Sequence, residues 1–137
     1  DWVIDLSGSF CEVVQPWQPD DQVLRAIERH CRSLLIEATP EHLVKLYKKQ
    51  QSDPKPLYYR PEFLDEHIPD MLDFYNVGNV EALAPSAVSD FLYPKLMQER
   101  MARYAAIVGG MGGRAFKLPM LESQALQPQE LDDLLAA

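Results

Sequence analysis

The stretch SAVSDFLYPKLMQERMARYAAIV, Ser86–Val108, carries the longest helical pattern in the chain. Its apolar residues recur at helical spacing, from Val88 through Leu96 to Val108, which predicts an amphipathic helix. We expect Ser86 to cap the start of this helix and Pro94 to bend it, because proline cannot donate the helical backbone hydrogen bond. The segment favours a mostly α-helical fold.

The next segment, IVGGMGGRAF (Ile107–Phe116), contains four of the six glycines in the chain. A Walker-type phosphate loop would need lysine and then serine or threonine after its last glycine, but Arg114 and Ala115 stand there. A dinucleotide-binding loop would follow a strand and open a helix, whereas this segment follows a predicted helix. A helix end therefore explains these glycines better than a phosphate site does.

We expect one of the first two glycines, Gly109 or Gly110, to take the left-handed conformation that ends many helices. Gly112 and Gly113 would then form a flexible turn. The alternative is a loop that closes on an anionic ligand. In that alternative the anion contacts would be Arg114 and Lys117.

The remainder of the chain is divided by prolines, of which there are eleven in all. Local start signals and apolar spacing predict four further helical segments. They span Asp20 or Asp21 to Leu35, Pro40 to about Gln50–Asp53, Pro61 to Tyr75, and Pro128 to Leu135. Pro69 predicts a kink or two short helices within 61–75, and the three prolines in 52–61 predict an extended connector.

Near the amino end, two short runs rich in β-forming residues, 2–6 and 10–14, flank the turn residues 7–9, which favours a small hairpin. The expected fold is thus mostly α, with five or six short proline-interrupted helices and this hairpin. We expect one helical domain over 1–118, in which 1–19 form a hairpin or extended arm. Residues 119–137 would form an acidic tail with a short helix.

The composition narrows the classes of function. The 137 residues fit one domain, and the net charge of −8 argues against a general binder of nucleic acid or anionic membrane. No apolar run is long enough for a membrane span, and no signal-peptide pattern is present. Cys11 and Cys31 predict two reduced thiols in a cytoplasmic protein, with a single disulfide between them as the alternative.

Charge is arranged in blocks along the chain. Residues 61–94 hold seven acidic residues and no lysine or arginine, whereas 45–60 and 95–117 are basic. One interpretation is that these blocks pack together and neutralise each other within the protein. The other is a polarised surface that orients a charged partner.

The leading hypothesis is a small acidic protein-binding domain: an adaptor, an assembly or secretion chaperone, or an inhibitor of a basic partner. We expect no catalysis and no cofactor, and a second copy of the chain is an alternative partner. The hypothesis rests on the charge blocks and on apolar groups in connectors and in the tail. The expected partner-binding residues are Trp17, Tyr58, Tyr59, Arg60, Arg100, Arg103, Leu131, Leu134 and Leu135.

Two other classes stay open. A metal-dependent enzyme could use the carboxylates of Glu62, Glu66 and Asp70, which share a helix face if Pro69 does not break the helical register, together with the neighbouring His67. A nucleic-acid accessory protein could use the basic block from Lys45 to Arg60, in which tyrosines alternate with cations.

Overall fold

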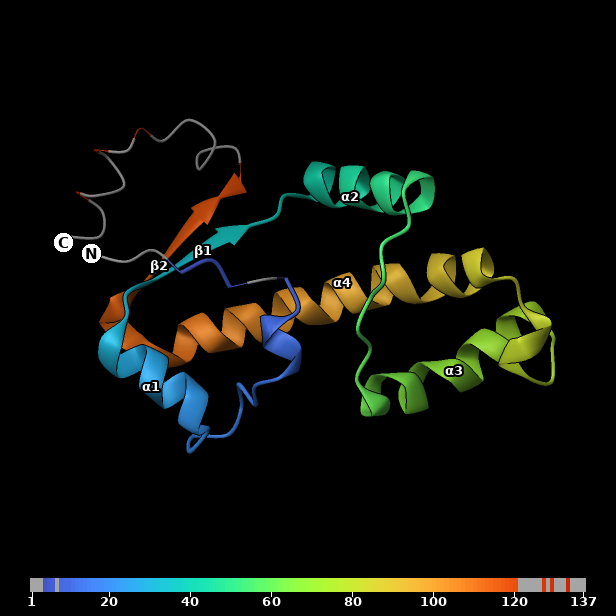
Figure 1. The fold of residues 1–137 in the computed structure, drawn as a ribbon, viewed down its shortest axis with the longest axis horizontal. Helices are drawn as coiled ribbons and strands as arrows, with labels where there is room; N and C mark the ends of the chain where they lie inside the picture. Colours follow the sequence, from blue (N-terminus) through green and yellow to red (C-terminus); the bar gives the residue numbers. More distant parts are fainter. Residues whose placement is uncertain (1–3, 7, 121–126, 128, 130–132, 134–137) are drawn as a thin grey trace.

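The computed structural model describes residues 4–6, 8–120, 127, 129 and 133. In this part of the chain the protein is mostly helical, with four α-helices, three short 3-10 turns and one two-stranded parallel sheet (Figure 1). The elements are η1 (Phe10–Glu12), α1 (Gln22–His30), β1 (Ser33–Glu37), α2 (Pro40–Ser52), α3 (Pro61–Tyr75), η2 (Val80–Ala82), α4 (Pro85–Gly110), η3 (Gly112–Arg114) and β2 (Ala115–Pro119).

Helix α4 is the longest of the described helices, and the other elements lie along its length (Figure 1). Its 26 residues extend about 39 Å at about 1.5 Å per residue. Its first half carries a core cluster with α3, made of Phe63, Met71, Leu92 and Leu96. Its last turn carries a second cluster with the amino-terminal segment, made of Cys11, Val14, Ile107 and Met111. The prediction of a mostly helical fold is confirmed.

Two of the predicted helix starts are confirmed by their caps. The Asp21 carboxylate accepts hydrogen bonds from the Val23 and Leu24 amides at 3.0 and 2.9 Å. The Thr39 hydroxyl accepts from the His42 amide at 3.2 Å. Ser86, however, does not cap α4: that helix begins at Pro85, with Ala84 at the capping position. Proline at the first helical position already has the required φ and has no amide to satisfy.

Prolines interrupt the helices less than predicted. Pro69 lies inside the continuous α3, so the alternative of two short helices over 61–75 is wrong. Pro94 lies inside α4, which is one helix as predicted, but with 26 residues it is not one of the short helices expected. Both proline residues are exposed. Water can therefore bond the carbonyl oxygen that each ring leaves unpaired one turn earlier.

The β-structure also differs from the prediction. The expected hairpin is absent among the described residues, because Phe10–Glu12 forms a 3-10 turn. The helix predicted to reach Leu35 ends at His30, and Cys31 is extended, with φ −123° and ψ 155°. Strand β1 follows and pairs in parallel with β2, with Leu34 opposite Phe116. The two paired segments are far apart in the sequence, so local spacing gave no sign of the pairing.

The glycine segment ends α4 as expected, but at another residue. The helix continues through Gly109 and Gly110, and the left-handed glycine is Gly112, with φ +58°. Gly113 lies in the η3 turn, which leads directly into β2. The order is helix, turn and strand, which is the reverse of a dinucleotide-binding loop.

None of the helices in the described part of the chain combines the length and the apolar character that crossing a bilayer requires.

Candidate functional site

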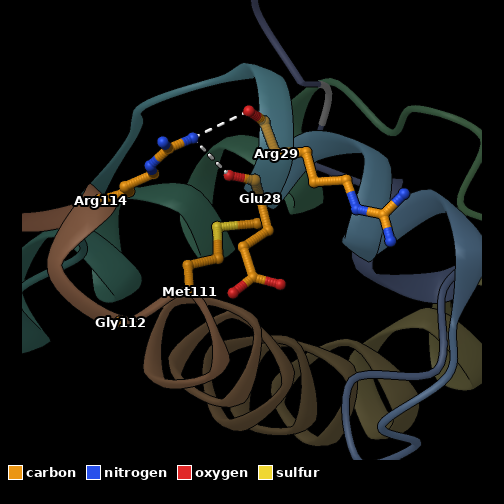
Figure 2. Close-up of a pocket in the computed structure, with 5 residues that line it drawn as sticks. All are labelled: Glu28, Arg29, Met111, Gly112 and Arg114. Carbon is orange, nitrogen blue, oxygen red and sulfur yellow. Dashed lines mark hydrogen bonds between the residues drawn. The ribbon is translucent and has the colours of Figure 1, made fainter.

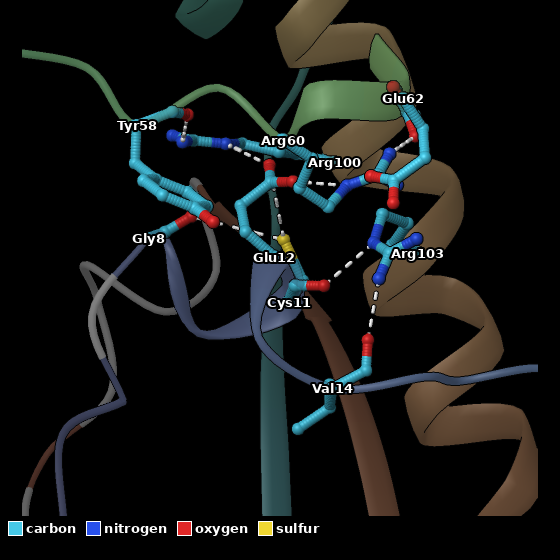
Figure 3. A network of polar contacts seen from close by, with 10 residues as sticks. Gly8, Cys11, Glu12, Val14, Tyr58, Arg60, Glu62, Arg100 and Arg103 are labelled. Atoms are coloured by element: carbon cyan, nitrogen blue, oxygen red, sulfur yellow. Dashed lines mark hydrogen bonds and ion pairs between the residues drawn. The ribbon is translucent and has the colours of Figure 1, made fainter.

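A buried carboxylate lies within a network of polar contacts that includes three arginines (Figure 3). The side chain of Glu12, in η1, is 1% exposed and lies between two arginines. One of its oxygens accepts from Arg60 Nε at 2.8 Å, and the other accepts from Arg100 Nε at 2.7 Å. Arg60 also forms an ion pair with Glu99. This network joins η1 to the connector before α3 and to α4.

Arg103, one turn further along α4, holds the amino-terminal segment through its backbone. It is 1% exposed, and its guanidinium donates to the carbonyl oxygens of Cys11 and Val14 at 2.6 and 2.5 Å. The guanidinium also lies over the Trp17 ring, 5.1 Å from the ring centre. Burial, with a second contribution from the charge of Arg60, lowers the pKa of Arg103.

These contacts change the interpretation of the predicted binding residues. Arg60, Arg100 and Arg103 are engaged inside the protein and present little surface to a partner. Tyr59 is half-buried and stacks on Phe63 with 5.7 Å between ring centres. The described residues of the predicted set that are exposed are Trp17 and Tyr58, and Leu131, Leu134 and Leu135 lie outside the described residues.

Glu12 was not predicted as important from the sequence. The available signal was a single carboxylate between the apolar residues Cys11 and Val13, where an unpaired charge would be costly to bury. The neighbouring Cys11 is fully buried, and burial, followed by the charge of Glu12, raises the pKa of its thiol. Both cysteines are free, so the alternative of a disulfide is wrong.

The acidic row is on the outer face of α3. Five carboxylates there are exposed, and of these five only Glu62 forms an ion pair with a described residue, Arg60 at 3.9 Å. His67 packs edge-on against Phe63, with 4.5 Å between ring centres. Within the described residues, no three His, Cys, Asp or Glu side chains lie close enough to hold a metal ion. The exposed carboxylates are Glu62, Asp65, Glu66, Asp70 and Asp73.

An exposed aromatic side chain ends the acidic face. Phe74 is 70% exposed and contacts Tyr75 and Phe91, with ring centres 4.9 and 5.4 Å apart. Lys95 lies over the Phe91 ring at 5.1 Å. The end of α3 therefore presents an apolar surface directly beside carboxylates.

The basic block lies partly on α2. Lys45, Lys48 and Lys49 are exposed, whereas Tyr47 contacts the Tyr93 ring and its hydroxyl donates to Asp90 at 3.5 Å. The expected alternation of stacking aromatics and cations on one surface is thus limited, because Tyr47 and Tyr59 pack inward.

Two hollows flank the carboxyl-terminal end of α4. The first, of about 540 Å³, is lined by Glu28, Arg29, Met111, Gly112 and Arg114 (Figure 2). Arg114 does not point freely into solvent: it donates to the carbonyl oxygens of Glu28 and Arg29 at 3.0 and 2.8 Å and so caps α1. Lys117 pairs with Glu37 at 3.5 Å. Both cations of the anion-binding alternative therefore have partners within the chain.

The second hollow, of about 390 Å³, lies between the Pro16–Pro19 segment, α1 and the last turn of α4.

Comparisons with known protein families, curated proteins and solved structures find no match to this chain.

Proposed function

We propose that this chain is a protein-binding domain that recognises a basic segment of its partner through the acidic face of α3. This face consists of Glu62, Asp65, Glu66, Asp70, Asp73 and Phe74. The supporting observation is that, among the described residues, the basic blocks pair with little of the acidic block over 61–94. Arg60 and Arg100 bind Glu12, which is buried, and leave the carboxylates of α3 largely uncompensated.

The network around Glu12 leaves the negative charge of the protein concentrated on α3. Neutralising buried Glu12 uses Arg60, which directly precedes α3, and Arg100 of α4. The exposed carboxylates then produce a local negative potential, which speeds encounter with a basic partner and orients it. Exposed charges contribute little affinity individually, so an apolar anchor is needed as well. Phe74 supplies such an anchor at the end of the row.

An adaptor, an assembly or secretion chaperone and an inhibitor would all use this face in the same way. A second copy of the chain is an alternative occupant, because α2 exposes Lys45, Lys48 and Lys49. Light scattering of the purified chain over a range of concentrations and salt distinguishes the two. Association that weakens with salt would assign the acidic face to self-assembly.

The test compares two charge-matched variants in capture from the native host lysate, read by quantitative mass spectrometry. The test variant is Asp65→Asn/Glu66→Gln/Asp70→Asn on α3. The control is Asp5→Asn/Asp20→Asn/Asp53→Asn, which removes the same charge from exposed positions elsewhere. We expect the α3 variant to lose about 3-fold to 150-fold in affinity for the captured protein, from three pairs of about 0.2–1 kcal/mol each. Equal capture by both variants would exclude the α3 face.

A further inference from the structure

The second hollow has the chemistry of a site for a cationic side chain. Its floor is apolar and well packed, because Ile107 and Met111 are 6% and 5% exposed. Trp17 stands beside it, 62% exposed, with Arg103 over its ring. An aliphatic stem can pack against such a floor while its charged group stays at the surface. The Trp17 ring already has Arg103 as its cation, so it would contribute apolar contact to the hollow.

The electrostatics of the hollow favour a positive charge. It is lined by Gly110 and Met111, where α4 ends, and the last turn of α4 contains no basic residue. Unpaired carbonyl groups give a helix carboxyl terminus a partial negative charge. Helix α1 differs, because Arg114 already binds its last carbonyl groups.

A carboxylate without a partner lies beside this helix end. Glu28 is half-buried and lines both hollows, and among the described residues no hydrogen bond or ion pair of its side chain is present. Asp21 also lines the hollow, but its carboxylate is occupied by the amides of Gln15, Val23 and Leu24. Arg25 is the cation in the lining, and it forms no ion pair with Glu28.

We propose that this hollow binds an arginine or lysine side chain of the partner, with Glu28 as the counter-charge. Trp17, Leu24, Ile107 and Met111 would contact the aliphatic stem. The inference rests on the proposed function for the basic nature of the partner, but it concerns a different surface from α3. The cation would lie at the carboxyl-terminal end of α4, whose last turn contains no basic residue.

The test uses short peptides as probes: acetyl-Ala-Arg-Ala-amide and acetyl-Ala-Lys-Ala-amide. The neutral controls replace arginine by citrulline and lysine by norleucine. The readout is the Trp17 indole resonance in a Trp2→Phe background, which leaves a single tryptophan. We expect saturable shifts with both cationic peptides, weakened by added salt, and no saturable shift with the neutral ones.

Glu28→Gln keeps the shape of the side chain and should weaken binding of the cationic peptides about fivefold, as expected for loss of one partly exposed ion pair. Glu81→Gln, in η2, is the matched control from an exposed position outside both proposed surfaces and should leave peptide binding unchanged. Equal shifts with arginine and citrulline, no shift with either, or unaltered binding by Glu28→Gln would each overturn the inference. If the α3 variant loses partner capture but the peptides do not bind at the hollow, the proposed function stands and this second site is excluded.

Discussion

Replacing Glu12 by glutamine would remove the negative charge of the buried side chain and keep its shape. Arg60 and Arg100 would then lose the carboxylate that they share. Both guanidinium groups would stay largely out of water, because their side chains are only 13% and 11% exposed. Removing one member of a buried ion pair typically costs about 3–5 kcal/mol, because the remaining charge stays desolvated. We expect the free energy of unfolding to fall by an amount near the lower limit, about 3 kcal/mol.

The lower limit applies because some compensation remains. Arg60 keeps its ion pair with Glu99, Arg100 keeps the Tyr58 carbonyl oxygen at 3.2 Å, and glutamine can still accept one hydrogen bond. A loss of about 3 kcal/mol is a large part of a typical stability of about 5–15 kcal/mol. In a chain of this length it corresponds to a decrease in Tm of about 10 °C.

Urea denaturation followed by circular dichroism measures this change, with Glu62→Gln as the control. Glu62 pairs with the same Arg60, at 3.9 Å, but its side chain is 77% exposed. We expect the control to change the free energy of unfolding by no more than about 0.5 kcal/mol. If Glu12→Gln costs no more than Glu62→Gln, the network around Glu12 does not hold the three segments together, and the reasoning from burial is wrong.

Further predictions concern one cap, two glycines and one tyrosine. Asp21→Ala should destabilise the protein by about 1 kcal/mol at pH 7 through loss of the α1 cap. Hydrogen bonds from the amides of Leu24, Gln15 and Val23 lower the pKa of Asp21, so the difference from wild type in urea titrations should shrink as pH falls below the ordinary aspartate pKa of about 3.9. Gly109→Ala adds a methyl group to open space within a helix and should stabilise by about 0.5–1 kcal/mol, whereas Gly112→Ala meets φ +58° and should destabilise; thermal melts of the pair must move in opposite directions. Burial raises the pKa of Tyr104 to about 12, so ultraviolet titration of Tyr104→Phe should lack the latest-ionising tyrosine, and stability should fall with rising pH between about 10 and that value, because unfolding then releases a proton.

Several features were predictable because their signals act over a few residues. Asp21 and Thr39 cap helices whose first amides lie within reach of their own side chains, and the prolines of 52–61 exclude a continuous helix whatever surrounds them. The glycine segment had to end a helix for the same local reason. The position of the left-handed residue, Gly112, was decided by the path into β2 and was not predicted.

The candidate binding surfaces required the tertiary structure. The sequence placed the carboxylates of α3 on one face and Trp17 in an exposed connector, because helical spacing and proline content fix these properties. It could not show that Arg60 and Arg100 bind Glu12, far away along the chain, instead of the acids of α3. That choice depends on which carboxylate is buried, and burial is set by packing between distant segments. The pairing of β1 with β2 could not be predicted for the same reason. Each strand is short and is stabilised by a partner that is distant in the sequence, which no local pattern indicates.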